Sequence, residues 1–170
     1  MSVTRFLLGI MLGLAVAPAI AWCAGDVLPL TAGDTLSGRH VVLADAVRGH
    51  ATVLVAGFSR EAGDRCGEWV KAIHADGELA SVNVYEIAML EGAPSLLRGM
   101  IKSGMKKGVP AAEHDRFVVF TQDEKLWRDY FDVKDTQIPY VVLIDASGTV
   151  LWRGHGLAAD TEQQLRGAMR

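Results

Sequence analysis

Apolar runs and helically spaced apolar positions alternate along most of the chain. Residues 52–58 (TVLVAGF) form a continuous apolar run bounded by turn signals, which is typical of a buried central strand. Residues 81–90 and 116–121, the latter containing FVVF, predict two further strands. Spacing and end signals predict helices between and after these strands, over residues 65–77, 94–107, 124–131 and 161–169.

The helix predicted over residues 65–77 follows the central strand after a short polar turn. Asp64 is expected to cap its start and Gly77 to close its end. Its apolar positions recur at i, i+3, i+4 and i+7 and therefore share one face of the helix, formed by Cys66, Trp69, Val70 and Ile73. We expect this face to pack against the sheet.

Two hairpins flank the alternating region. Residues 33–43 (GDTLSGRHVVL) contain a Ser-Gly turn before a β-branched pair, and residues 140–154 (YVVLIDASGTVLWRG) contain a strand, a tight turn and a strand. Strands alternating with helices, followed by a hairpin and a last helix, predict an α/β fold with a mixed sheet. A single domain is expected over residues 33–170.

The start of the chain has a different pattern. Arg5 is followed by FLLGIMLGLAVAPAIA, a charge-free stretch of 16 residues that ends with small residues suited to cleavage. This pattern predicts a secretory signal peptide over residues 1–21, an extended leader over residues 22–32, and an exported, periplasmic protein. An uncleaved membrane anchor is the alternative, although the stretch is slightly short for a membrane span.

Charge and cysteine content narrow the function classes. The net charge of -3 gives no global field that would favour nucleic acid. The chain has 2 cysteines, and Cys23 lies beside the predicted processing site, so a disulfide framework is excluded. Cys66 is therefore either a lone thiol or the partner of Cys23.

Three features in this order resemble the thioredoxin superfamily. The stretch TLSGRHVVLADAVRGHATVLVAGFS resembles the start of exported thiol reductases and peroxiredoxins. Counting from Phe58 places Gly63 and Cys66 on the two positions of the Cys-x-x-Cys motif. The third feature, Ile138-Pro139-Tyr140 before a hairpin, resembles the cis-proline element of the superfamily. The resemblance implies a three-layer fold, with helices on both faces of a mixed central sheet, and a substrate- or partner-binding role for the proline element.

A narrower resemblance covers the end of the chain. YVVLIDASGTVLWRGHGLAADTEQQL is similar to the C-terminal signature of the mitochondrial ATP synthase assembly factor family, with Trp152-Arg153 in reversed order. The matching positions are Tyr140, Leu143, Asp145, Trp152, Gly154, Gly156, Ala158 and Glu162. Members of that family can lack the redox cysteine pair, so the resemblance implies a binding or assembly role.

Cys66 is the one candidate catalytic residue, and the sequence contains signals both for a reactive thiolate and for a buried thiol. A position near a helix start and the proximity of Arg60 and Arg65 would favour the thiolate. The apolar face that contains Cys66 instead indicates burial, which raises the pKa of a thiol. Gly63 stands where the attacking cysteine would be, so a dithiol cycle within this segment is impossible. With a dithiol cycle excluded, four interpretations of Cys66 stay open: a structural cysteine, a single-cysteine oxidoreductase or peroxidase, a bridge to Cys23, or a metal carrier.

The metal-carrier reading would combine Cys66 with His114 or His155. The 5 histidines show no ligand spacing, and His155 lies between two glycines as in an exposed turn. The sequence therefore predicts no metal site and no cofactor.

The helix predicted after Pro94 is amphipathic and basic. Its apolar stripe consists of Leu97, Met100, Ile101, Gly104 and Met105, and its positive charges are Arg98, Lys102, Lys106 and Lys107, with no acidic residue between them. One reading is a helix that packs on the core and leaves a solvated basic face. The other is an electropositive contact, through Arg98, Lys102 and Lys106, with anionic lipid or an acidic membrane protein.

Together these patterns predict an exported thioredoxin-fold protein without dithiol activity. It would bind a protein partner, as a binding, assembly or chaperone-type factor for a membrane-associated complex. The partner would contact the proline element, Ile138, Pro139 and Tyr140, and the basic helix. Single-cysteine thiol chemistry and metal transport are the alternatives.

Overall fold

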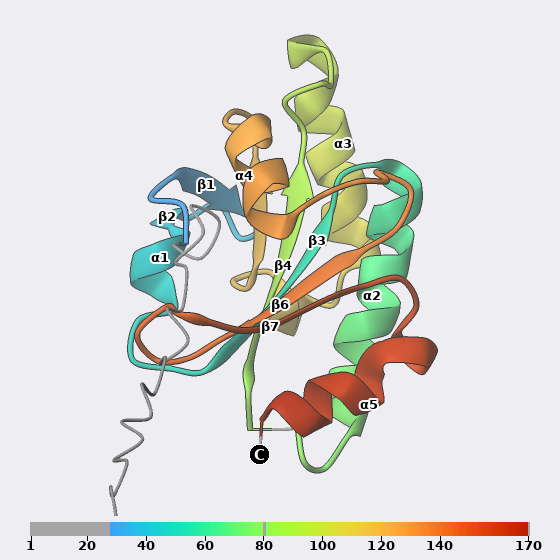
Figure 1. Cartoon of the computed structure of the whole chain (residues 1–170). Coiled ribbons are helices and arrows are strands. Elements are labelled where there is room, and N and C mark those ends of the chain that lie inside the picture. Colours follow the sequence, from blue (N-terminus) through green and yellow to red (C-terminus); the bar gives the residue numbers. More distant parts are fainter. Residues whose placement is uncertain (1–27, 80, 170) are drawn as a thin grey trace, which may run out of the picture.

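The computed structural model describes residues 28–79 and 81–169, and their strands form one seven-stranded sheet (Figure 1). The predicted signal peptide, most of the predicted leader, and Cys23 lie outside the described residues. The strand order is β2-β1-β5-β4-β3-β6-β7. The strands are β1 (Ala32–Thr35), β2 (His40–Val42), β3 (Thr52–Gly57), β4 (Asn83–Met89), β5 (Phe117–Phe120), β6 (Tyr140–Ile144) and β7 (Val150–His155).

The sheet is mixed, as the sequence predicts. Strands β3, β4 and β5 run parallel, whereas β6 pairs antiparallel with β3 and β7 pairs antiparallel with β6. At the other side of the sheet, β1 pairs antiparallel with both β5 and β2. Both predicted hairpins are therefore present, one at each end of the strand order.

Helices cover both faces of the sheet, which confirms the three-layer α/β architecture (Figure 1). Helices α1 and α4 pack on one face, and α2, α3 and α5 pack on the other. The helices are α1 (Leu43–Ala46), α2 (Arg60–Ala75), α3 (Ser95–Gly108), α4 (Glu124–Phe131) and α5 (Ala158–Ala168), and a 3-10 turn, η1, spans Ala111–Glu113.

The central strand β3 shows why the apolar run is continuous rather than alternating. Val53 and Val55 pack against α2, while Leu54 and Ala56 pack against the layer that contains α4. Every residue of β3 is buried. Since both faces of the strand are covered by helices, each position must be compatible with burial.

The start of α2 differs from the prediction. The helix begins at Arg60, not at residue 65, because Ser59 rather than Asp64 is the N-cap. The Ser59 hydroxyl accepts a hydrogen bond from the Ala62 N–H at 3.1 Å, which satisfies a first-turn N–H that has no partner within the helix. The end also differs slightly, since α2 stops at Ala75 with Asp76 as its C-cap.

Within residues 28–79 and 81–169, no helix has both the length and the apolar character needed to cross a membrane.

Candidate functional site

The start of α2 and the proline element lie at the same end of the sheet. Ala56 near the end of β3 pairs with Tyr140, the first residue of the neighbouring strand β6. Phe58, which directly follows β3, therefore lies close to Tyr140. Their rings meet edge to face, with centroids 6.1 Å apart. The structure thus brings the two predicted parts of the site together.

Cys66 is buried beneath this end of the sheet rather than exposed at its surface. It is the seventh residue of α2 and is fully buried, with Trp69 and Ile73 on the same buried face. Burial, and secondarily the nearby Glu86 carboxylate, raises the pKa of the Cys66 thiol well above its ordinary value. The helix dipole does not offset this increase because its effect falls off within the first turn. The geometry therefore favours the structural reading of Cys66.

Gly57 is a residue of the site that sequence reasoning missed. A Cβ atom at Gly57 would lie 2.9 Å from the Gly63 nitrogen and 3.2 Å from the Cys66 sulfur. Strand β3 and the first turn of α2 are thus packed backbone to backbone, which only glycine permits. Gly63 is different, because a Cβ atom there would meet nothing within 4 Å. Packing therefore does not require glycine at position 63.

The proline element is mostly buried. Pro139 and Tyr140 are buried, and Ile138 is partly exposed. The Tyr140 hydroxyl accepts hydrogen bonds from the backbone N–H groups of Lys134 and Asp135, each at 2.9 Å. Tyr140 therefore holds the preceding loop in place, and Ile138 is the part of the element that remains accessible to a partner.

The structure gives the isomer of the peptide bond before Pro139, which the resemblance to the cis-proline element left open. Every peptide bond of the described residues is trans, including the bond before Pro139. The Pro139 carbonyl accepts the Gly156 N–H at 3.0 Å, which extends the β6–β7 pairing across this position. The trans form that most X-Pro bonds adopt is compatible with this pairing.

The glycines of the C-terminal signature have packing roles. The Trp152 ring covers Gly154, so that a Cβ atom there would lie 2.2 Å from the ring. Gly156 has φ +93°, a conformation that favours glycine, and its carbonyl accepts the Trp69 indole N–H at 2.8 Å. The turn after β7 is therefore hydrogen-bonded both to α2 and to the proline element.

Arg128 lies over the Phe58 ring at the end of the sheet where α2 begins. The Arg128 guanidinium lies 6.0 Å from the centroid of the Phe58 ring, and it pairs with Glu124 at 2.8 Å. Phe58 also meets Phe131 edge to face at 6.0 Å. Sequence reasoning missed Arg128, because its contact with Phe58 depends on the docking of α4. The exposed Arg60 begins α2 at the same end.

The basic residues of α3 do not share one environment. Arg98 donates hydrogen bonds to the carbonyls of Glu91 at 2.8 Å and Ala93 at 3.0 Å. Lys102 pairs with Asp34 at 3.4 Å, so both Arg98 and Lys102 turn toward the body of the protein. Lys106 is exposed and its ammonium group makes no hydrogen bond or ion pair with the described residues.

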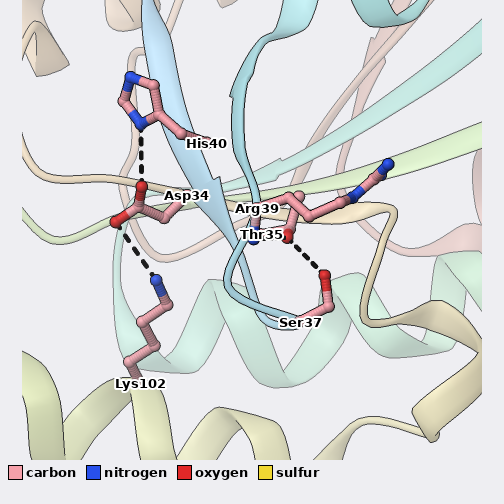
Figure 2. A network of polar contacts seen from close by, with 6 residues as sticks. All are labelled: Asp34, Thr35, Ser37, Arg39, His40 and Lys102. Carbon is pink, nitrogen blue, oxygen red and sulfur yellow. Dashed lines mark hydrogen bonds and ion pairs between the residues drawn. The ribbon is translucent and has the colours of Figure 1, made fainter.

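Figure 2 shows the polar network that anchors α3 to the β1–β2 hairpin. Asp34 contacts both Lys102 of α3 and His40 of β2, the latter at 3.0 Å. The hydrogen bond with His40 and the charge of Lys102 hold the pKa of Asp34 below its ordinary value. On the other side of the hairpin, Ser37 and Arg39 contact Asp115. These contacts indicate a structural anchor.

Among the described residues, no group of three or more His, Cys, Asp or Glu side chains could hold a metal ion. The His114 Nε2 atom lies within hydrogen-bond distance of the carbonyls of Lys106 and Val109, at 3.1 and 3.0 Å. The His155 ring packs at 5.8 Å from the Tyr140 ring. Both histidines are thus engaged by neighbouring backbone or aromatic groups, and Cys66 is buried.

Solved structures share the fold. A protein described as a thiol:disulfide interchange protein, DsbE, from Chlorobium tepidum superposes with a TM-score of 0.57 and is 24% identical, over 86% of this chain and 97% of that one. BsSco, a member of the Sco family of cytochrome c oxidase assembly proteins, has a TM-score of 0.55 and 14% identity over 84% and 92%. Yeast Sco1, solved with copper bound, has a TM-score of 0.54 and 11% identity over 85% and 93%. These likenesses show a thioredoxin-like fold.

Sequence comparison places the chain in a family. No curated protein sequence is significantly similar to it. The family model of ATP10 protein, in contrast, matches residues 15–167, which is nearly the whole chain and includes the C-terminal signature. The chain belongs to the ATP10 protein family.

Proposed function

We propose that this protein is an exported assembly factor that binds a subunit of a membrane complex at the shared end of α2 and the proline element. Membership of the ATP10 family makes it an assembly-type factor for a membrane complex. The observation that carries the proposal is the absence of an accessible thiol in the described part of this site. Ser59 caps α2, Gly63 follows in the first turn, and Cys66 is buried.

The surface of this end is suited to binding a protein chain. Ile138 and Arg128 are partly exposed above buried aromatic rings, and Arg60 adds a positive charge at the start of α2. Such a combination of apolar and arginine side chains is frequent in protein interfaces. In the same proposal, the basic helix α3 contacts an anionic membrane surface beside the partner.

A complementation experiment tests the binding role. In cells that depend on this protein, assembled ATP synthase, the complex that the family indicates, is measured on native gels. We expect Ile138→Glu and Arg128→Glu to reduce assembly, and Cys66→Ala to support it once its folding has been verified. The exposed Lys71→Glu is the matched control. Normal assembly with both Ile138→Glu and Arg128→Glu would contradict the proposed binding surface.

The thiol alternative has its own test. We expect the protein not to reduce the disulfides of insulin. We also expect a thiol reagent to label Cys66 slowly in the folded protein near neutral pH. Labelling should become fast only when denaturant exposes the thiol. Rapid labelling of Cys66 itself in the native protein, together with insulin reduction that Cys66→Ala abolishes, would support the single-cysteine enzyme instead.

Determining the N-terminal residue and the cell fraction of the protein recovered from its producing cell tests export. Processing after Ala21, with recovery from the periplasmic fraction, is expected. An intact N-terminus in the membrane fraction would indicate the uncleaved anchor.

A further inference from the structure

Helix α3 is attached to the body along one side only. None of its residues is buried, although Ile101 and Met105 pack against the cluster formed by β4 and β5. Arg98 and Lys102 also face the body, where they bind loop carbonyls and Asp34. The apolar and polar contacts with the protein therefore use the same side of α3.

The opposite side of α3 carries large apolar side chains in solvent. Leu96 is 95% exposed and Met100 is 66% exposed, and one helical turn separates them. Lys107 follows on the same line, seven residues after Met100, while Leu97 and Lys106 flank this line. We call these five residues the outer face of α3. In Figure 1 the first turn of α3 projects beyond the end of the sheet.

We propose that the outer face of α3 docks on an anionic lipid surface, with its first turns inserted and its last turn bound to phosphate groups. Leu96, Leu97 and Met100 enter the boundary between headgroups and acyl chains. Lys106 and Lys107 contact lipid phosphates. The inference rests on the proposed function, because it names the surface on which the assembly factor works.

The distribution of charge points to an anionic surface. From Ser95 to Gly108 there is no acidic residue, and within the described residues the ammonium groups of Lys106 and Lys107 make no ion pair. The chain as a whole carries a net charge of -3, so this basic segment is a local exception. An anionic membrane would therefore attract this helix and repel much of the remaining surface, which orients the protein.

The order of residues favours lipid over a groove in a protein. A helix that binds in a groove presents apolar anchors over successive turns, at i, i+3 or i+4, and i+7. Here the apolar positions of the outer face stop at Met100, and Ser103 and Lys107 continue the line. Apolar side chains in the first turns and lysines in the last turn match a helix that lies tilted in the membrane interface.

Sedimentation with vesicles tests the proposal on the full chain. Wild-type protein is compared on vesicles of phosphatidylcholine alone and of phosphatidylcholine with phosphatidylglycerol. We expect binding about tenfold or more stronger to the anionic vesicles, and loss of this preference in the double variant Lys106→Glu/Lys107→Glu. The double variant Leu96→Gln/Met100→Gln should bind about tenfold more weakly, while glutamine retains helix propensity.

Matched controls separate the helix from the rest of the chain. Lys71→Glu on α2 and Leu126→Gln on α4, where Leu126 is 47% exposed, should bind vesicles like the wild type. Because every variant keeps the same N-terminal segment, its contribution to binding is constant. Circular dichroism and urea unfolding verify that the variants fold.

Several outcomes would overturn the proposal. Unchanged vesicle binding by either double variant would show that the outer face does not contact lipid. If those variants bind vesicles normally but fail in the assembly assay, the outer face binds a protein and the lipid assignment is wrong. The partner-binding role proposed for the shared end of α2 and the proline element fails independently, when Ile138→Glu and Arg128→Glu leave assembly intact.

Discussion

Glu86 is a largely buried carboxyl group of β4 with a raised pKa, and its replacement by glutamine tests the packing between α2 and the sheet. Its side chain points from β4 toward α2, into a cavity of about 10 Å³ also lined by Val70, Glu113 and Arg116. Burial, with a secondary effect of the Glu113 charge, raises the pKa of Glu86 from 4.5 to about 7. The folded protein therefore holds this proton more tightly than the unfolded chain does.

The direction of the stability effect follows from this difference. Between pH 4.5 and pH 7 the folded state binds more protons at Glu86 than the unfolded state, so the free energy of unfolding decreases as pH rises. A change from 4.5 to about 7, at 1.36 kcal/mol per pKa unit, corresponds to at most about 3 kcal/mol. The contribution is fully present below pH 4.5 and is lost above pH 7.

Urea unfolding of wild type and Glu86→Gln from pH 4 to pH 8 measures this contribution. Glutamine resembles the protonated carboxyl group, so the two proteins should have similar stability near pH 4. At pH 8 the variant should be more stable by up to about 3 kcal/mol. Carboxyl groups with lowered pKa, such as Asp34 and Asp145, act in the opposite direction but cancel in the difference between the two proteins.

Glu68→Gln, on the exposed side of α2, is the matched control and should show no such pH dependence. A stability difference between wild type and Glu86→Gln that is the same at pH 4 and pH 8 would refute the reasoning. It would mean that water reaches the Glu86 carboxylate in the folded protein and solvates its charge.

Three backbone and side-chain variants test the geometry of the candidate site by urea unfolding. Gly57→Ala should cost about 1–3 kcal/mol, because its Cβ atom would meet the Gly63 backbone at 2.9 Å. Gly63→Ala should instead be neutral or stabilise by up to about 1 kcal/mol, since its Cβ has open space in a helix. Tyr140→Phe should cost about 1–3 kcal/mol and increase amide exchange in the preceding loop, because two N–H groups lose their acceptor. Equal effects of Gly57→Ala and Gly63→Ala, or unchanged exchange in Tyr140→Phe, would contradict this geometry.

The strands and helix α4 were predictable because their signals are local. The apolar run of β3, the FVVF strand, and the turn between β6 and β7 are each specified within a few residues, and the observed bounds agree with them. Helix α4 has the predicted bounds Glu124–Phe131. The predicted apolar face of α2 is also confirmed, since periodicity alone selects residues that share one side of a helix.

The start of α2 was not predictable in the same way. Ser59 and Asp64 are both good N-cap residues, and the sequence around each is compatible with a helix start. The contact between Gly57 and Gly63 supports the earlier start, because the first turn of α2 packs directly on the end of β3. That contact depends on the three-dimensional path of the chain, so local sequence could not decide between Ser59 and Asp64 as the N-cap.

The orientation of α3 was also not predictable from the local sequence alone. The spacing of Leu97, Met100 and Ile101 predicts one inward stripe, but only the Ile101 side of that stripe reaches the sheet. The reason is that α3 covers β5 and the hairpin beside it, where loop carbonyls and Asp34 also require partners. Arg98 and Lys102 satisfy them, and the helix rotates Met100 into solvent.

These two differences change where the interactions of the protein are expected. If α2 began near residue 65, Cys66 would lie in the first turn of the helix, and thiol chemistry at this end would be reasonable. With α2 beginning at Arg60, the thiol lies almost two turns beyond the start of the helix and is buried next to the end of β3. If α3 had buried Met100, its exposed surface would be mainly polar and basic. Its observed rotation instead exposes apolar and basic side chains together, which is the combination that a membrane interface can accommodate and a purely aqueous surface does not explain.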